Sequence, residues 1–380
     1  MINKKIKVPF LNLKSEYSEM YTELQSAFNK VLSSGQVILG KEVEKIEKKY
    51  AKFSSVKYCV GVGNGLDALT ISLRALGIKQ GDEVIVPSNT YIATAIAISR
   101  IGGKPVFVEP RSDTYNINPD RIENSITKKT KAIIPVHLYG QACEMDKIME
   151  IAKKNKLYVV EDNAQSHGAK FKNKITGSFG DINATSFYPS KNLGALGDGG
   201  AITTADHELY EKVLLLRNYG SKRKYYNEII GYNSRLDELQ ASFLNVKLKF
   251  LKANNKKKND IANFYKRELR NIGDIILPVN AEDATSVYHI FLIRTKKRDL
   301  LQKYLLRNNI STLIHYPIPP HLSKAYSFLG FKRNDFPIAE EIADTCLSLP
   351  IYPQITKEQL EYTVSKIKNF YRWKNLSFRL

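Results

Sequence analysis

A lysine followed by a run of glycines is the residue of this chain that is best suited to covalent chemistry. Lys191 lies between Ser190 and Asn192, and four glycines follow it within residues 194–200. The preceding residues 184–188 are apolar and aromatic, as expected of a buried strand. A lysine that leaves such a strand loses solvent, which disfavours its charged form and lowers its pKa. Because a neutral amine attacks carbonyl groups, Lys191 is a candidate Schiff-base lysine.

A carboxylate at the end of another apolar stretch supports this interpretation. On position alone Lys191 would more often be a surface lysine, since the chain holds 58 lysines and arginines. Residues 157–160 form a short apolar run that ends in Glu161 and Asp162. Ligands of open parallel sheets bind at the carboxyl ends of the strands. There a carboxylate could keep a pyridinium nitrogen protonated, whereas capping of a helix is the structural alternative for Asp162.

Several motifs, in one order along the chain, resemble a known family. They are PFLNL (9–13), GNGLDAL (63–69), PSNTYIAT (87–94), HLYGQ (137–141), EDNAQSHGA (161–169), SFYPSKNLGALGDGG (186–200) and GYNSRLDELQA (231–241). Together they resemble the DegT/StrS sugar-nucleotide aminotransferases, which use pyridoxal phosphate. The resemblance implies an α/β protein of the PLP-dependent transferase fold (fold type I). Its mostly parallel mixed sheet would be covered by helices and followed by a smaller C-terminal α+β domain.

The resemblance also implies roles for individual residues. Lys191 and Asp162 would be catalytic, with Lys191 bound covalently to the cofactor and Asp162 at its pyridine nitrogen. The other implied cofactor contacts are Gly65, Leu66 and Ser186 at the phosphate, Tyr91 against the ring, Gln165 at the ring hydroxyl, and Asn233 of the neighbouring subunit at the phosphate. Implied substrate contacts are Tyr188, Tyr219, His315 and Tyr316.

A glycine turn near residue 63 supports the phosphate assignment independently. Residues 57–62 read as a strand, and a helical pattern follows at 66–76. A strand, a glycine turn and a helix together present free backbone N–H groups and a positive helix end, where phosphate binds. The GxGxG spacing is a weak dinucleotide fingerprint, because no acid follows at the end of a second strand. The turn therefore favours a single phosphate.

The cysteines and the apolar runs restrict the protein class. Three cysteines without CxxC spacing argue against a disulfide framework and against a zinc site, and no metal is expected. They are typical of a reducing compartment, so we expect a cytoplasmic protein. The N-terminus lacks an apolar core of signal-peptide length, and no run approaches about 18 apolar residues, so no membrane association is expected.

The net charge of +20 is the unusual feature of the composition. A basic groove for nucleic acid is one interpretation. However, the lysines alternate with glutamates at 41–53, and the densest run is only Lys256–Lys258. We therefore interpret most of the excess as solvated surface and predict no nucleic-acid partner. Part of this charge could steer an anionic nucleotide sugar towards a cleft.

Alternating strands and helices up to about residue 160 predict a parallel sheet. A helix is expected at 235–252, and the charged residues 254–260 suggest a boundary near 250. The predicted domains are thus a cofactor-binding α/β domain, 1–250, and an α+β domain, 251–380. Within the second domain the patterns predict strands at 288–295 and 310–317 and helices at 298–309 and 357–371.

The resemblance implies a homodimeric aminotransferase with shared active sites, acting in deoxyamino-sugar biosynthesis. Lys191 is retained where related dehydratases carry histidine, so the resemblance implies amino transfer. The predicted reaction moves the amino group of L-glutamate to C3 of a dTDP-3-keto-6-deoxyhexose, giving a dTDP-3-amino-3,6-dideoxyhexose. Gln141 and His315–Tyr316 are candidates for the pocket lining that selects C3. The configuration at C4 stays open, as do three alternatives: a 4-keto-sugar aminotransferase, a lyase or dehydratase, and a non-catalytic regulator that binds DNA.

Overall fold

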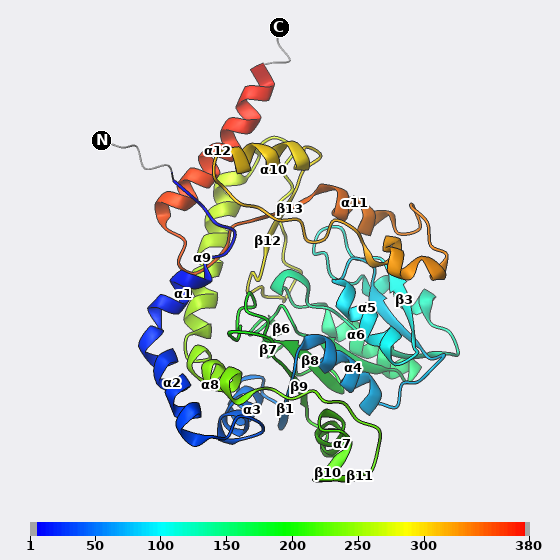
Figure 1. Ribbon diagram of the computed structural model, residues 1–380. Coiled ribbons are helices and arrows are strands. Elements are labelled where there is room, and N and C mark those ends of the chain that lie inside the picture. Colours follow the sequence, from blue (N-terminus) through cyan, green and yellow to red (C-terminus); the bar gives the residue numbers. More distant parts are fainter. Residues whose placement is uncertain (1–5, 377–380) are drawn as a thin grey trace.

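A seven-stranded mixed sheet forms the centre of the computed structural model, which describes residues 6–376 (Figure 1). The strand order is β1-β9-β8-β5-β4-β2-β3, and only β9 runs antiparallel to its neighbours β1 and β8. The prediction of a mostly parallel mixed sheet is therefore confirmed. The strands are β1 (Tyr58–Val62), β2 (Glu83–Pro87), β3 (Lys104–Val108), β4 (Thr130–Ile133), β5 (Tyr158–Asp162), β8 (Ile182–Ser186) and β9 (Gly200–Thr204).

Helices cover both faces of this sheet, which is why its strands read as apolar runs without alternation. Val84 and Val86 of β2 face one core with α4, α5 and α7, whereas Ile85 faces a second core with α6. Helices α3 and α8 pack over the β1 and β9 end. The bounds are α1 (Leu13–Glu19), α2 (Tyr21–Ser34), α3 (Lys41–Phe53), α4 (Gly65–Ala75), α5 (Ile92–Arg100), α6 (Met145–Asn155), α7 (His207–Arg217) and α8 (Glu238–Lys247).

The C-terminal part has its own apolar core around a two-stranded antiparallel sheet. Val8 belongs to this core and pairs with Ile310, so the N-terminal segment packs against the C-terminal part. The elements are α9 (Leu251–Leu269), β12 (Phe291–Arg294), α10 (Arg298–Arg307), α11 (Pro337–Thr345), β13 (Cys346–Leu349) and α12 (Lys357–Leu376). Two short hairpins, β6–β7 (Lys170–Phe171, Lys174–Ile175) and β10–β11 (Ser221–Arg223, Tyr226–Asn227), lie outside both sheets.

Two expected elements differ in the structure. The helix predicted at 235–252 is α8 followed by α9, and α9 continues through the charged residues 254–260, connecting the region of α8 to that of α12 (Figure 1). Lysine is a good helix former, so a run of lysines does not have to end a helix. The strand predicted at 310–317 is absent, because this segment makes only isolated bridges, at Ile310 and Leu313. The division into domains 1–250 and 251–380 stays a prediction.

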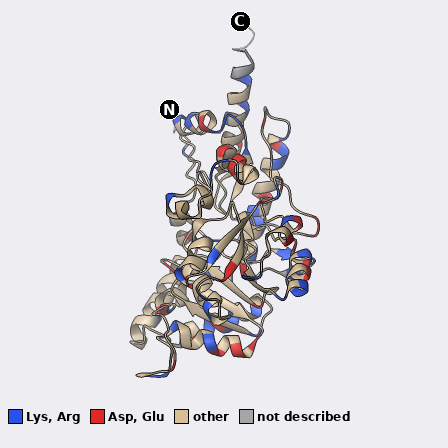
Figure 2. Cartoon of the chain, turned by 90° about the vertical axis from the view of Figure 1, so that its right-hand side faces the viewer, with Lys and Arg blue, Asp and Glu red and all other residues tan. Residues whose placement is uncertain are grey.

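None of the helices within residues 6–376 combines the length and the apolar character needed to cross a lipid bilayer. The basic residues are distributed along many helices and loops on the side of the molecule that Figure 2 shows, with acidic residues among them.

Candidate active site

A cleft of about 540 Å³ lies at the carboxyl ends of the parallel strands. Ten of the residues singled out in the sequence line it together: Gly65, Leu66, Tyr91, Asp162, Gln165, Ser186, Tyr188, Lys191, His315 and Tyr316. They come from segments more than 200 residues apart, and the sheet brings them together because parallel strands end at one edge. The volume is in the range of small-molecule sites, roughly 300–1,000 Å³.

Lys191 lies on a tight turn that follows β8. The turn is closed by backbone hydrogen bonds from Lys191 to Tyr188 (2.8 Å) and from Ala195 to Phe187 (2.7 Å). A Cβ atom on Gly194 would lie 2.3 Å from the carbonyl oxygen of Pro189, so this turn requires glycine. Burial lowers the pKa of Lys191 to about 8, against the attraction of Asp162. Among the described residues the Lys191 amine has no hydrogen-bond partner, so it is free to react.

Asp162 is the last residue of β5 and is 6% exposed. Its Oδ2 accepts a hydrogen bond from the Thr94 hydroxyl at 2.9 Å, and its Oδ1 accepts one from the amide of Ala164 at 3.1 Å. Burial raises the pKa of Asp162, while these two hydrogen bonds and the charge of Lys191 oppose the rise. The carboxylate is therefore oriented by two donors and has a cationic neighbour.

Gln165 connects two walls of the cleft. Its Oε1 accepts from the amide of Tyr139 at 2.7 Å, and its Nε2 donates to the hydroxyl of Tyr316 at 3.1 Å. The ring of Tyr316 lies 5.2 Å from that of Tyr91, tilted by 38°. Tyr91 itself is 53% exposed, so one face of its ring is open to a planar ligand. His315 donates to or accepts from the Ser348 hydroxyl at 2.8 Å, and burial lowers its pKa to about 4.

The N-terminus of α4 lies beside Ser186. Asn64 caps the helix, because its side chain accepts from the amide of Asp67 at 2.8 Å. The amides of Gly65 and Leu66 have no partner among the described residues, as expected at a helix start that binds an anion. A Cβ on Gly65 would lie 2.6 Å from the Cβ of Ser186. Glycine at this position thus allows the helix end and the serine to face the same space.

Two predicted residues lie outside the cleft of this single chain. Asn233 is exposed, and its backbone pairs with Asn218 in an isolated bridge. Tyr219 is 49% exposed, with the guanidinium of Arg235 5.4 Å from its ring centre. The suggestion that Gln141 lines the pocket is wrong, because its side chain binds the backbone of residues 279 and 281 instead.

Two side chains of the cleft were not found by sequence reasoning. Thr94 orients Asp162, although 68 residues separate them. His289 lines the cleft, and burial, followed by the charge of Lys191, lowers its pKa well below the usual value. Thr94 ends the PSNTYIAT motif, which was a usable signal. His289 is a lone histidine in an apolar run, and such residues are more often part of a core.

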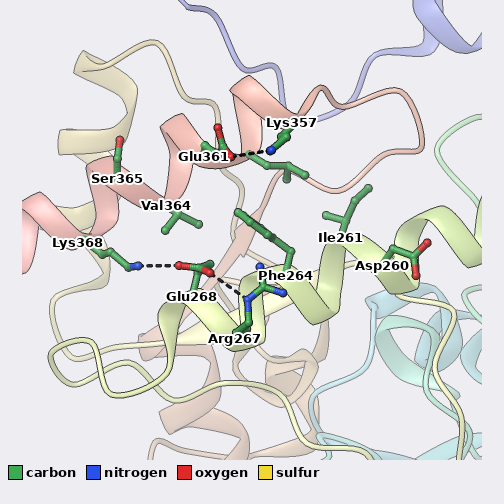
Figure 3. A pocket seen from close by; sticks show the side chains of 11 residues that line it. Asp260, Ile261, Phe264, Arg267, Glu268, Lys357, Glu361, Val364, Ser365 and Lys368 are labelled. Atoms are coloured by element: carbon green, nitrogen blue, oxygen red, sulfur yellow. Dashed lines mark hydrogen bonds and ion pairs between the residues drawn. The ribbon is translucent and has the colours of Figure 1, made fainter.

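Another hollow, of about 640 Å³, lies between α9 and α12 (Figure 3). Apolar side chains form part of its wall: Ile261, Phe264 and Val364. Charges at its rim are paired, Lys357 with Glu361 at 3.7 Å and Lys368 with Glu268 at 2.9 Å (Figure 3). Because both lysines are already paired with carboxylates, this hollow offers no counterpart to the unpaired amine of the cleft.

Comparisons with known proteins agree with the geometry of the cleft. The DegT/DnrJ/EryC1/StrS aminotransferase family profile matches residues 18–368. A dTDP-3-amino-3,6-dideoxy-alpha-D-galactopyranose transaminase from Aneurinibacillus thermoaerophilus is 52% identical over 96% of this chain and 99% of its own length.

Two solved structures extend the likeness to the fold. DesV of S. venezuelae, in complex with a ketimine intermediate, has a TM-score of 0.94 and 44% identity over 96% of this chain and 98% of that one. NtdA of Bacillus subtilis, with bound cofactor PMP, has a TM-score of 0.90 and 33% identity over 98% and 87%. The predicted fold of pyridoxal-phosphate transferases is therefore confirmed. This chain belongs to the DegT/DnrJ/EryC1/StrS aminotransferase family.

Proposed function

We propose that this chain transfers the amino group of L-glutamate to C3 of a dTDP-3-keto-6-deoxyhexose, giving a dTDP-3-amino-3,6-dideoxyhexose. As a member of its family the chain is an aminotransferase that uses pyridoxal 5'-phosphate. The observation that carries the proposal is the partly buried amine of Lys191, which has no hydrogen-bond partner among the described residues and lies beside Asp162, in a chain 52% identical to a transaminase of a dTDP-3-amino sugar.

The residues of the cleft fit the cofactor. The free amides of Gly65 and Leu66, with the Ser186 hydroxyl, supply donors for a phosphate at a positive helix end. Asp162 supplies a buried carboxylate for a pyridine nitrogen, and Gln165 lies where it could bind a ring hydroxyl. When bound, pyridoxal phosphate supplies an electron sink for the carbanion at the donor carbon.

Lys191 supplies the nucleophile and the base. Its amine, with a pKa of about 8, is part neutral near neutral pH and can attack a carbonyl. With the amine donor bound, the Lys191 amine would be free to accept the proton from the donor Cα and to return it to the bound cofactor. In the second half-reaction the same amine moves the proton in the opposite direction. One lysine thus accounts for both half-reactions.

The test of the chemistry uses purified protein, glutamate and both dTDP-3-keto and dTDP-4-keto 6-deoxyhexoses. We expect an amine at C3, located by NMR, and none with Lys191→Ala. Borohydride should attach the cofactor to Lys191. Efficient amination of the 4-keto isomer alone would refute the C3 assignment and leave the amino transfer intact. Keto-acid release without an amine donor would identify a lyase, and steeply salt-dependent binding of duplex DNA would support a regulator.

We further infer a cytoplasmic homodimer in which Asn233 of one subunit completes the phosphate site of the other. The three free cysteines Cys59, Cys143 and Cys346 support a reducing compartment. Mixing Asn233→Ala with Lys191→Ala protein tests the shared site. Hybrids would contain one doubly damaged and one intact site and should regain activity. If subunits exchange and activity does not return, the site is not shared.

A further inference from the structure

Tyr139 contacts two parts of the cleft without lining it. It lies in the turn η3 (Leu138–Gly140) with a φ of 58°, a left-handed conformation that is uncommon for a residue with a side chain. Its backbone N–H donates to Gln165 Oε1 at 2.7 Å. Its hydroxyl donates to the carbonyl oxygen of His315 at 2.5 Å. Tyr139 thus holds both the Gln165 side chain and the His315 backbone.

These bonds close a ring around the cleft wall. Gln165, fixed by Tyr139 at Oε1, points its Nε2 at the hydroxyl of Tyr316, 3.1 Å away. The neighbouring His315 carbonyl is held by Tyr139 from the other side. Among the described residues the other donor to this carbonyl is the Cys346 thiol, whose sulfur lies 3.6 Å away and is a weak donor. The Tyr139 hydroxyl is therefore the strong anchor of this peptide.

The His315 ring is held by the Ser348 hydroxyl at 2.8 Å, but the backbone of this segment makes few hydrogen bonds. The amides of Ser311 and Leu313 donate to the carbonyls of Val8 and Ser348. The amides of residues 314–316 have no backbone acceptor among the described residues. Burial raises the pKa of Tyr139 well above its usual value, so its hydroxyl stays a donor at every working pH. Loss of this donor would leave the His315–Tyr316 backbone free to shift relative to Gln165.

We propose that Tyr139 is a positioning residue that fixes His315 and Tyr316 against Gln165 and thereby shapes the wall that receives the keto-sugar. The inference rests on the proposed function. Replacing the tyrosine by phenylalanine removes the hydroxyl but keeps the backbone N–H, so Gln165 keeps its orientation towards the cofactor. The effect should therefore fall on the half-reaction that uses the sugar and spare the one that uses glutamate.

The chain offers a matched control in Tyr115. Its ring packs against that of Tyr139, with centres 5.8 Å apart at 69°, and it is 2% exposed. Its buried hydroxyl has no hydrogen-bond partner among the described residues. Tyr115→Phe thus deletes the same atom at a neighbouring buried site without breaking a bond.

The test measures both half-reactions of the holoenzyme by single-turnover absorbance for wild type, Tyr139→Phe and Tyr115→Phe. For Tyr139→Phe we expect the rate at limiting dTDP-3-keto-6-deoxyhexose to fall about tenfold, the effect of one hydrogen bond. The glutamate half-reaction and cofactor affinity should stay within about twofold of wild type, and Tyr115→Phe should match wild type throughout.

Two results would overturn the inference. Equal slowing of both half-reactions in Tyr139→Phe would show a general structural role, and a sugar half-reaction like that of Tyr115→Phe would show no role. The wild-type reaction reports separately on the proposed function. If wild type accepts glutamate but aminates no keto-sugar, the proposed function fails, and this inference fails with it.

Discussion

The neutral fraction of Lys191 determines how much reactive amine the cleft contains. Burial lowers its pKa to about 8, whereas an exposed lysine has a pKa of about 10.4. At pH 8 about half of Lys191 is then neutral, against roughly 0.4% of an exposed lysine. Burial thus raises the concentration of neutral amine at this pH by about a hundredfold. Asp162 opposes this effect, so Asp162→Asn should lower the pKa of Lys191 further.

Competitive acetylation of the cofactor-free protein measures this fraction. Trace acetic anhydride is applied between pH 6 and 11, and the peptide that contains Lys191 is quantified by mass spectrometry. We expect its reactivity to level off above about pH 9, with a midpoint near 8, while exposed lysines in the same digest continue to gain reactivity towards pH 10. In Asp162→Asn the midpoint should be lower. A tenfold rise per pH unit up to pH 10 would refute the argument, because it would identify an ordinary solvated lysine.

The remaining predictions concern binding, stability and pH. Thr94→Val removes a donor from Asp162, so the pKa of Asp162 should rise and the cofactor should bind about tenfold more weakly in equilibrium dialysis; Thr94→Ser should restore affinity. Glu238 accepts from three buried backbone amides at the start of α3, so Glu238→Gln should lower unfolding free energy by about 2–3 kcal/mol in urea titrations; an unchanged midpoint, like that of the exposed control Glu358→Gln, would contradict this. Since burial lowers the pKa of His315 to about 4, its ring should be neutral above pH 5.5, and kcat/KM should show no inflection from it near pH 6.5. An inflection near pH 6.5 that disappears in His315→Gln would show that the ring titrates in this range.

The sequence could predict those features of the cleft that follow from the ends of single strands, but not the contacts between side chains that are distant in the chain. Asp162 ends one strand and Lys191 follows another, and a parallel sheet brings such ends to one edge, so their proximity could be expected. Thr94 lies in a recognised motif, but its contact with Asp162 across 68 residues is tertiary, and the motif does not name the partner. The same limit explains Gln141, whose motif was recognised but whose side chain binds residues of the C-terminal half.

Errors in the elements have a similar origin. Residues 310–317 contain β-branched and aromatic side chains, as a strand often does. A strand also needs a partner along its length, and here the backbone hydrogen bonds of the amides fall only at Ile310, Ser311 and Leu313. A sequence pattern indicates which side chains are buried, but it does not show which other backbone segment lies close enough to pair. In α9 the reverse holds: the charged residues 254–260 were expected to follow the end of a helix at 252, but they belong to α9, and Lys258 within them is buried.

The charge of the substrate provides a physical reason for a second subunit. A dTDP-sugar carries a diphosphate, and buried anions need paired cations. Within the described part of the chain, the basic side chains lining the cleft are Lys191, His289 and His315, and burial lowers the pKa of all three. Both histidines are therefore neutral near pH 7, and Lys191 is committed to the cofactor in our proposal. One chain alone leaves the diphosphate poorly compensated.

Asn233 and Tyr219 were predicted to contact this site, but in the single chain they lie outside it. Both are on an exposed surface near Arg235. A neighbouring copy that brings this surface to the cleft would supply both the missing phosphate contact and positive charge. For the proposed substrate, this charge argument favours a partner subunit. Hybrid dimers would decide it: recovery of activity when Asn233→Ala and Lys191→Ala subunits are mixed requires that the two side chains serve one site from different chains.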